Sequence, residues 1–408
     1  MPIDADRPIR LLTFSGLYPS TARPTHGIFV EQRLRQLLDS GRVEARVVAP
    51  VPWFPFRHRI FGEYSRIAAT PRRATRHGVE VEYARFPVLP KIGAWLTPYL
   101  LAAAAAPAIR RIVDRGFDFD VLDAHYFFPD GVAAARIGRR FGKPTVITAR
   151  GSDVNVLTRF RAPRRMILRA AEQAAAVVTV SDALRQSLED LGVDPGRLHV
   201  LRNGVDLGRF RPVEPRPAGW PWPDGRRTIL SVGNLIEGKG HHLVIRALER
   251  LDGLRLVVVG AGRMRGELSE LVSRLGLSAR VHLAGTVDQT ELPAYYSTAD
   301  ALVLASRREG MPNVVLEALA CGCPVVATAV GGIPEIIAGS SAGMLLADDD
   351  PETIAAAVGD LLARPIDRRA IRQFAERFGW EKTVERQIDL FSRIATAQTT
   401  VTAIADER

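Results

Sequence analysis

Short apolar runs rich in β-branched residues alternate along the whole chain with stretches whose apolar residues recur every three or four positions. The runs are six to eight residues long, which predicts strands, and the periodic stretches predict helices. Runs such as residues 256–259 (LVVV) have no polar alternation, which indicates strands buried on both faces of a parallel sheet. This alternation is typical of doubly wound α/β domains. The predicted strands are residues 9–15, 45–50, 79–86, 120–126, 145–150, 176–181, 228–234, 254–260, 279–285, 301–306 and 324–330.

A proline-rich segment divides these elements into two halves. Residues 209–227 contain five prolines and little apolar periodicity, which predicts an interdomain connection. A chain of 408 residues is long enough for two such domains. Ligands of open parallel sheets bind beyond the carboxyl ends of the strands, so we expect the site at the cleft between two facing domains. The predicted parts are a first domain (1–205), a linker (206–227), a second domain (228–380) and a loose tail (398–408).

Composition excludes several classes of protein. Apolar residues make up 47% and charged residues 25% of the chain, which is ordinary for a globular protein and excludes wholesale disorder or collagen. Cys321 and Cys323 are the only cysteines, and one intervening residue suits neither a disulfide framework nor a zinc site. The uncharged stretch 92–109 contains Pro98 and Pro107, which argues against a membrane span. The first residues lack the basic and apolar regions of a secretory signal, so we expect a cytoplasmic protein.

Two segments of the second half carry candidate chemistry. Lys239 lies between two glycines at the start of a predicted helix, where free N–H groups and the helix dipole attract phosphate. After the strand at 301–306, Pro312 suits the first turn of a helix through Ala320, which places Glu309 in a loop and Glu317 on the helix. Carboxylates accept hydrogen bonds from sugar or ribose hydroxyls, and the amides of Met311, Asn313 and Val314 could hold a diphosphate.

An ordered series of motifs resembles one family. GNLIEGKG (233–240), VVVGAG (257–262), S-x2-E-G-x6-E-A-L-A-C-G-x-P-V-V-A (306–327) and GGIPE (331–335) are similar to the donor-binding domain of family-4 retaining glycosyltransferases. The likeness extends to HGIFVEQRLRQL (26–37), DAHYFFPDG (123–131), TARGSDVN (148–155) and TVSDALRQSL (179–188). It implies the GT-B fold, which consists of two facing Rossmann-like domains. FAERFGWEKTVERQIDLF (374–391) is similar to the final helix of the family, which crosses back onto the first domain, and this implies such a helix over 381–397.

The resemblance also implies roles for individual residues. Lys239 would bind the donor diphosphate, and Glu317 would hold the ribose hydroxyls. Glu309 and the backbone of Gly310, Met311, Pro312, Asn313 and Val314 would contact the transferred sugar and the phosphates. His125 would lie near the reacting sugar, and the turn at Gly27 would close on the donor or acceptor. The catalytic residues expected are therefore His125, Glu309 and Lys239.

Three positions depart from the family pattern. Asn234 stands where the family usually has an arginine paired with the lysine, and the nearby Arg263 is a candidate replacement. A single glycine, Gly27, follows His26 where two glycines are common. Arg150 precedes Gly-Ser-Asp153 where a histidine is common, so Arg150 and Asp153 are the acceptor-side candidates.

The implied reaction moves a sugar from a nucleoside-diphosphate donor, UDP- or GDP-linked, to a glycan or polyprenyl-linked acceptor with retention of configuration. Lys239 and oriented amides would stabilise the leaving diphosphate, so the reaction needs neither metal nor cofactor. The D-x-D match at Asp118–Asp120 precedes a strand and is interpreted as a surface turn. The setting implied is cell-surface polysaccharide or glycolipid synthesis.

The first half carries an excess of positive charge. Residues 1–200 contain 30 Lys and Arg against 19 Asp and Glu, whereas the second half is nearly neutral. The basic residues of 53–77 and 159–169 are interleaved with aromatic and apolar ones, which suits either an anionic membrane surface or a solvated face. No nucleic-acid recognition motif accompanies the charge.

Three other functions remain open. A nicotinamide-dependent oxidoreductase is disfavoured because VVVGAGRMR has Arg265 at the third glycine position of the dinucleotide fingerprint. A GT-B epimerase or phosphorylase, or a non-catalytic homologue, would share the fold without transfer to a separate acceptor.

Overall fold

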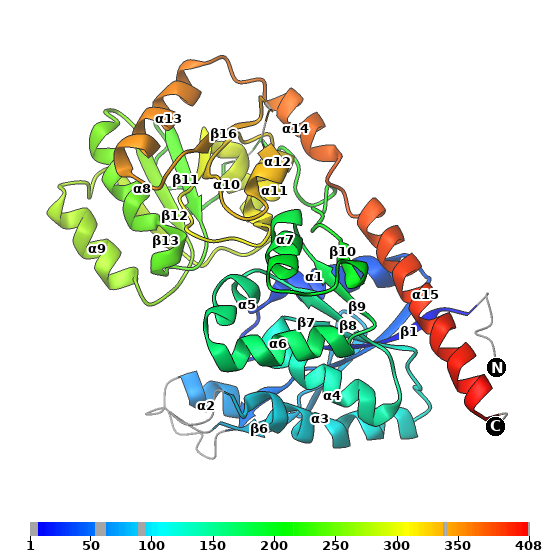
Figure 1. The fold of residues 1–408 in the computed structure, drawn as a ribbon. Helices are drawn as coiled ribbons and strands as arrows, with labels where there is room; N and C mark the ends of the chain where they lie inside the picture. Colours follow the sequence, from blue (N-terminus) through cyan, green and yellow to red (C-terminus); the bar gives the residue numbers. More distant parts are fainter. Residues whose placement is uncertain are drawn as a thin grey trace. The chain divides into compact units, whose positions relative to one another are not determined.

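The computed structural model describes residues 7–53, 63–88, 95–214, 216–337, 339 and 341–406. The chain forms two compact units. Unit 1 comprises residues 1–202 and 382–408, and unit 2 comprises residues 203–381. Both units are parallel-sheet α/β structures (Figure 1), as the strand–helix alternation predicts.

Unit 1 is built on an eight-stranded sheet in the order β10-β9-β8-β7-β1-β2-β5-β4. All neighbours are parallel except β4, which runs antiparallel to β5. The central strands β7 and β8 are buried along their whole length, as continuous apolar runs predict. The strands are β1 (Ile9–Phe14), β2 (Val43–Val48), β4 (Arg73–Arg76), β5 (Val79–Glu82), β7 (Val121–His125), β8 (Thr145–Ala149), β9 (Ala176–Thr179) and β10 (Leu198–Val200).

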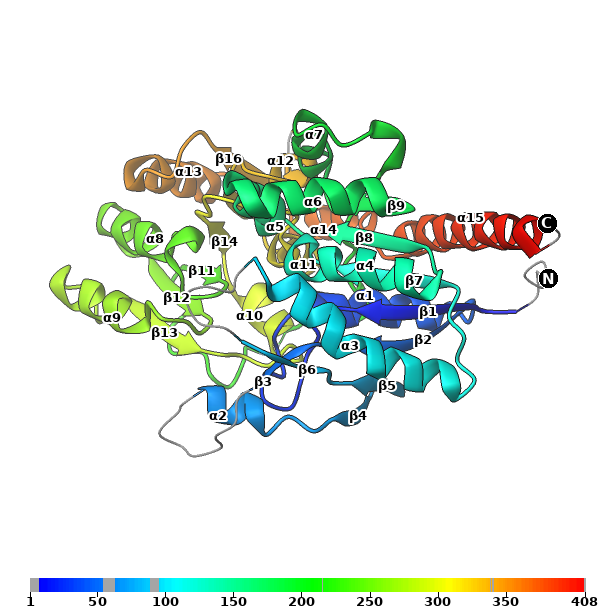
Figure 2. The ribbon, with the colours of Figure 1, turned by 60° about the horizontal axis from the view of Figure 1, so that its bottom comes forward.

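Helices cover both faces of this sheet. The helices α3, α4 and α6 lie side by side over one face (Figures 1 and 2). On the other face, Val30 and Leu34 of α1 and Phe391 of α15 pack into one apolar cluster with residues of β1 and β2. The helices are α1 (Ile28–Asp39), α2 (Glu63–Ala68), α3 (Thr97–Asp114), α4 (Val132–Phe141), α5 (Ser152–Asn155), α6 (Arg161–Gln173), α7 (Asp182–Asp190) and α15 (Glu381–Asp406).

Unit 2 has a six-stranded, entirely parallel sheet in the order β13-β12-β11-β14-β15-β16. The strand order reverses between β11 and β14, which is where ligands of doubly wound sheets bind. Its strands are β11 (Thr228–Val232), β12 (Arg255–Val259), β13 (Val281–Gly285), β14 (Ala301–Leu304), β15 (Val325–Thr328) and β16 (Gly343–Leu346). Its helices are α8 (His241–Ala247), α9 (Arg265–Arg274), α10 (Leu292–Thr298), α11 (Asn313–Ala320), α12 (Ile333–Ile337), α13 (Pro351–Ala363) and α14 (Arg368–Glu376).

The stretch 79–86, predicted as one strand, is split in the structure. The chain leaves the large sheet after Glu82, and β6 (Arg85–Pro87) pairs instead with β3 (Val51–Trp53) in a separate two-stranded sheet. Tyr83 and Ala84 form the step between the two sheets, and the Tyr83 hydroxyl donates to the carbonyl oxygen of Pro19 at 2.8 Å. A uniform apolar pattern does not reveal a change of pairing partner.

The proline-rich segment is not a free linker. Unit 2 begins at Asn203, and Phe210 within the segment is buried. Trp220 packs edge-on against Tyr295, with ring centroids 5.7 Å apart. The aromatic residues therefore anchor a segment whose prolines exclude regular structure.

The tail predicted to be loose from residue 398 is helical, because α15 continues to Asp406. Adding residues to a helix that has already formed avoids the cost of nucleation, so an alanine- and threonine-containing tail can extend it. In the described part of the chain, no helix is both long and apolar enough to cross a membrane.

Candidate active site

The turn that carries Lys239 lies at the carboxyl end of β11. Residues Glu237–Lys239 form a single 3-10 turn, and Gly240 then adopts a left-handed conformation at the start of α8. A Cβ on Gly240 would lie 2.0 Å from the carbonyl oxygen of Ala305, so only glycine allows this approach to the end of β14. The strain-free turn directs Lys239 toward the loop that follows β14.

Lys239 and Glu309 form an ion pair in this loop. Lys239 Nζ donates to Glu309 Oε1 at 2.6 Å, and the two side chains are 25% and 8% exposed. A largely buried carboxylate holds the ammonium in place, while a quarter of the lysine side chain remains accessible to a ligand. The structure therefore brings together two of the three residues predicted to be catalytic.

Three strand-to-helix turns meet at this end of the sheet of unit 2. The amide of Arg307 donates to Gly238 O at 3.0 Å, and the amide of Gly332 donates to Gly310 O at 2.8 Å. These bonds join the loops after β11, β14 and β15, as their shared carboxyl-end position predicts. Helix α11 begins one residue after Pro312, at Asn313, and its first amides have no acceptor within the helix. The amides of Asn313 and Val314 therefore remain candidates for binding phosphate.

Glu317 lies on α11 and is 6% exposed. The Tyr296 hydroxyl donates to its Oε2 at 2.9 Å, and burial raises the pKa of Glu317 to about 7. Its second oxygen, Oε1, accepts no hydrogen bond from the described part of the chain. Tyr296 thus fixes one oxygen and leaves the other for a ligand hydroxyl.

The loops that carry Asn234 and Arg263 are joined to each other. The amide of Leu235 donates to Ala261 O at 2.9 Å, and the amide of Met264 donates to Leu235 O at 3.0 Å. Asn234 and Arg263 are both exposed on these adjacent turns. This placement keeps Arg263 as a candidate for the missing basic group.

In unit 1, His125 ends the buried strand β7 and lies between two charged side chains. Its Nδ1 is 2.7 Å from Arg150 Nη2, and its Nε2 is 3.1 Å from Asp123 Oδ2. A guanidinium can only donate, so Nδ1 accepts and Nε2 carries the proton that is donated to Asp123. Burial lowers the pKa of His125, which favours this neutral ring. Both ring nitrogens are therefore engaged within the protein, and the ring is almost completely buried.

Arg150 is placed by this histidine and by α1. Its guanidinium lies 5.1 Å above the ring of Phe29, near the start of α1. The residue before α1, Gly27, has a φ of 58°, and a Cβ there would lie 2.1 Å from Leu17 O. The structure thus brings His125, Arg150 and the start of α1 together in unit 1.

Asp153 serves the backbone of its own loop. Its fully buried carboxylate accepts from the amides of Gly151 at 2.7 Å and Phe127 at 2.8 Å. It also accepts from the amides of Arg150 and Val154. These bonds hold together the loops that follow β7 and β8, so the carboxylate organises the site around Arg150.

Sequence reasoning missed Tyr296, Asp123 and Asp130 as functional neighbours. Asp130 is buried after β7, and its Oδ1 accepts from the amide of Gly16 at 2.5 Å. Burial raises the pKa of Asp130 to about 7. Asp123 and Asp130 lie inside the recognised stretch 123–131, whereas no signal in the sequence joins Tyr296 to Glu317.

We expect Asp130 to make the stability of unit 1 depend on pH. The folded-state pKa is near 7 and the unfolded value is about 3.9, so the folded state retains the proton and loses stability as the pH rises from about 4 to about 7. Asp130→Asn should flatten the fall in Tm over this range, because an amide does not titrate, and its oxygen can still accept from the amide of Gly16. Tm curves at closely spaced pH values would measure this. The exposed Asp360→Asn is the control, and identical curves for wild type and Asp130→Asn would contradict the assignment.

Solved structures with the same architecture define the class. Sucrose-phosphate synthase of Thermosynechococcus elongatus superposes with a TM-score of 0.79 at 19% identity, covering 95% of this chain and all of that one. Anabaena HepE, solved with UDP and glucose, gives 0.68 at 19% identity, with 94% and 100% covered. Together with the residues gathered at the strand ends, the fold is that of the GT-B glycosyltransferases.

Sequence comparisons identify the family. The family described as "Glycosyltransferase Family 4" matches residues 56–209, and "Glycosyl transferases group 1" matches residues 214–378. The chain belongs to these family-4, group 1 glycosyltransferases. The teichuronic acid biosynthesis protein TuaC of Bacillus subtilis is 29% identical over 361 residues, 86% of this chain and 88% of TuaC. A D-inositol 3-phosphate glycosyltransferase of Mycobacterium bovis is 31% identical over 320 residues, 72% of this chain and 66% of the relative.

Proposed function

We propose that this enzyme transfers a sugar from a nucleoside-diphosphate donor to a glycan or polyprenyl-linked acceptor in polysaccharide or glycolipid synthesis, with retention and without a metal. The observation that carries the proposal is the Lys239–Glu309 pair beside the first amides of α11. A fixed ammonium and oriented N–H groups stabilise negative charge as it grows on a leaving diphosphate. UDP and GDP are the favoured bases, and the UDP named in the HepE structures supports the first.

In unit 2, each binding role is assigned to a residue whose polar atoms remain accessible to a ligand. Lys239 binds the diphosphate, and Glu309 holds Lys239 and contacts the transferred sugar through the loop that includes Gly310. Oε1 of Glu317 accepts from a ribose hydroxyl while Tyr296 holds Oε2. The departing phosphate takes the proton of the acceptor hydroxyl, so no further carboxylate is required as a base.

Arg150 provides a positive group on the acceptor side, with His125 as the group that positions it. The neutral His125 ring accepts from Arg150 and leaves the positive charge of the guanidinium intact. The names of the two relatives, which refer to teichuronic acid and to an inositol phosphate, support an anionic acceptor. The excess of positive charge in residues 1–200 is consistent with such a substrate.

Nucleotide binding tests the proposal directly. Tm should be measured with UDP, GDP, ADP, dTDP and NAD, each without metal. A nucleotide at about 100 times its Kd stabilises the folded protein by about 2.7 kcal/mol, which gives a clear shift. We expect a shift with UDP or GDP that is lost in Lys239→Ala. A shift with NAD alone would replace the proposal with an oxidoreductase. Release of the nucleoside diphosphate from its sugar in the presence of acceptor would separate an active enzyme from a non-catalytic homologue.

We also propose that α6 associates with an anionic membrane surface. Phe160, directly before α6, is 59% exposed. Ile167 is buried, so Phe160 is the residue that supplies an apolar contact with the membrane. The exposed basic residues of α6 are Arg161, Arg164, Arg165 and Arg169.

The other basic segment, residues 53–77, gives the membrane proposal less support. Arg73 pairs with Glu82, and Arg76 pairs with Glu31. Part of that segment lies outside the described residues, namely Phe54, Phe56, Arg57, Arg59 and Phe61.

The double variant Arg164→Ala/Arg165→Ala should bind phosphatidylglycerol vesicles about 30-fold less tightly at low salt, because each cation contributes about 1 kcal/mol near such a surface. Vesicle sedimentation would measure the partition coefficient. Arg246→Ala/Arg274→Ala removes the same charge from exposed positions of unit 2 and should change nothing. Absence of wild-type binding at low salt would reject the membrane proposal.

A further inference from the structure

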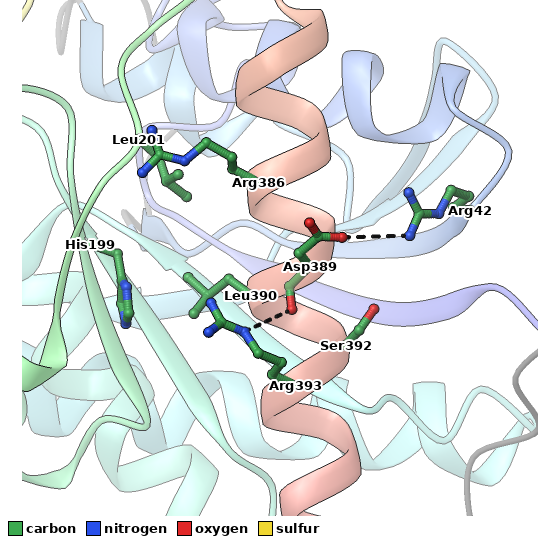
Figure 3. Close-up of a pocket in the computed structure, with 8 residues that line it drawn as sticks. All are labelled: Arg42, His199, Leu201, Arg386, Asp389, Leu390, Ser392 and Arg393. Atoms are coloured by element: carbon green, nitrogen blue, oxygen red, sulfur yellow. Dashed lines mark hydrogen bonds and ion pairs between the residues drawn. The ribbon is translucent and has the colours of Figure 1, made fainter.

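Unit 1 also contains a basic hollow whose lining includes none of the residues assigned to catalysis. It is a hollow of about 620 Å³ between β10, helix α15 and the turn before β2. Figure 3 shows that Arg386, Arg393 and His199 lie on the same side of α15. Arg386 and Arg393 are seven residues apart, which places them two turns apart on one helix face.

The charges in the hollow are not balanced. Three guanidinium groups line it, and its one carboxylate is that of Asp389. Asp389 points toward Arg42 on the other side of the helix (Figure 3), and their atoms are 3.8 Å apart with both side chains more than half exposed. An exposed pair of this kind contributes little. The hollow therefore has a net charge of about two positive units when His199 is neutral.

No acidic residue of the described part of the chain pairs with Arg386 or Arg393. Within the described ranges, Arg386 makes no hydrogen bond or ion pair, and Arg393 makes a single bond to the backbone oxygen of Asp389 at 3.4 Å. The pKa of His199 is lowered, first because the ring is half-buried and then because the positive charges of Arg393 and Arg386 lie nearby. Two exposed guanidinium groups beside β10, with no acidic partner among the described residues, form an attractive site for an anion.

The shape of the hollow favours a phosphate ester over a small inorganic anion alone. Its sides present planar guanidinium forks, which match the oxygens of phosphate in bidentate geometry. Leu201 and Leu390, both buried, also line the hollow and can contact a carbon-bearing part of the ligand. Ser392 lies on the other side of α15, with Asp389 and Arg42 (Figure 3), so it is not part of the proposed phosphate contact.

We propose that this hollow binds the phosphate group of a phosphate ester through Arg386 and Arg393. A soluble phosphorylated metabolite and a phospholipid headgroup present the same chemistry. The site is formed within unit 1 alone, so it does not depend on the donor-binding residues of unit 2.

Chemical modification would locate the site residue by residue. The wild-type protein is treated with phenylglyoxal, which modifies accessible arginines, in sodium pyrophosphate or in sodium chloride of equal ionic strength. Mass spectrometry then follows each arginine. We expect pyrophosphate to slow modification of Arg386 and Arg393 and to leave the exposed Arg139 and Arg140 unaffected. Equal rates in both salts at Arg386 and Arg393 would overturn the proposal.

Variants would then identify the source of the phosphate. All proteins carry Lys239→Ala, so that pyrophosphate binding at the donor site does not contribute. Arg386→Ala/Arg393→Ala is compared with Arg139→Ala/Arg140→Ala, which removes equal charge from α4. We expect the first pair to weaken binding about tenfold or more for each charged hydrogen bond lost.

Calorimetry with pyrophosphate and sedimentation with phosphatidylglycerol vesicles give distinct outcomes. Weaker pyrophosphate binding with unchanged vesicle binding supports a soluble phosphate ester. Weaker vesicle binding, beyond that of the control pair, supports a lipid headgroup. Unchanged binding of both probes would overturn the proposal, and it would leave the assignment of Lys239 intact because that residue is altered in every arm.

Discussion

Replacing Lys239 by alanine should lower kcat/KM for the donor sugar about 10- to 150-fold. The estimate follows from the loss of a charged hydrogen bond of roughly 1.5–3 kcal/mol to the leaving diphosphate, at tenfold for each 1.36 kcal/mol. The effect should appear in kcat as well as in KM, because charge on the diphosphate grows in the transition state. Initial rates of nucleotide release across donor concentrations would separate the two constants.

The variant also removes the partner of the largely buried Glu309. Lys239→Met/Glu309→Gln is therefore a second variant, in which neither side chain leaves a buried charge unpaired. Lys382→Ala is the control, since Lys382 is exposed at the start of α15. Wild-type kcat/KM in Lys239→Ala, with its Tm unchanged, would show that Lys239 does not bind the diphosphate.

Replacing Asp153 by alanine should lower the Tm of unit 1 by roughly 6–12 °C. The carboxylate accepts from four backbone amides, and a buried donor left without an acceptor costs about 1–3 kcal/mol. Water can enter the vacated space, so we expect a net loss of about 3 kcal/mol, at about 2–4 °C for each kcal/mol in a domain of this size. Calorimetry would resolve this transition from that of unit 2.

Activity should fall together with stability in this variant. The loops joined by Asp153 also carry Arg150 and Phe127, so their separation displaces the acceptor-side residues. Asp360→Ala, at an exposed position of α13, is expected to leave both properties unchanged. A Tm within about 1 °C of wild type would mean that the four amides find other acceptors.

The chain pattern was sufficient to predict two parallel-sheet domains, because buried strands and amphipathic helices have distinct periodicities. The pattern was insufficient where the structure of a segment depends on which strand or side chain it contacts. Residues 79–86 have one continuous pattern, yet they pair in two different sheets. The segment 206–227 has the composition of a linker, but it is part of unit 2, where Trp220 packs against Tyr295 and Trp222 against His282.

The residues of the candidate site could be predicted where they lie in loops at the carboxyl ends of strands. Lys239 and Glu309 lie in the loops that follow two neighbouring strands of the sheet, β11 and β14, so their proximity follows from topology. Tyr296 lies on a helix that precedes β14, and only packing brings its hydroxyl to Glu317. Asp153 was expected only as a residue of the acceptor side, and nothing in the sequence indicates that its carboxylate accepts from backbone amides.

The path of the chain determines the order in which the two units can fold during synthesis. Unit 2 is a continuous insertion, residues 203–381, within the sequence of unit 1. The apolar face of the first sheet needs Ile388, Leu390 and Phe391 from α15, and these residues are made after unit 2. A ribosome-bound chain can therefore complete unit 2 while that face of unit 1 is still uncovered and exposed to aggregation. The domain whose synthesis begins first is the last to be finished.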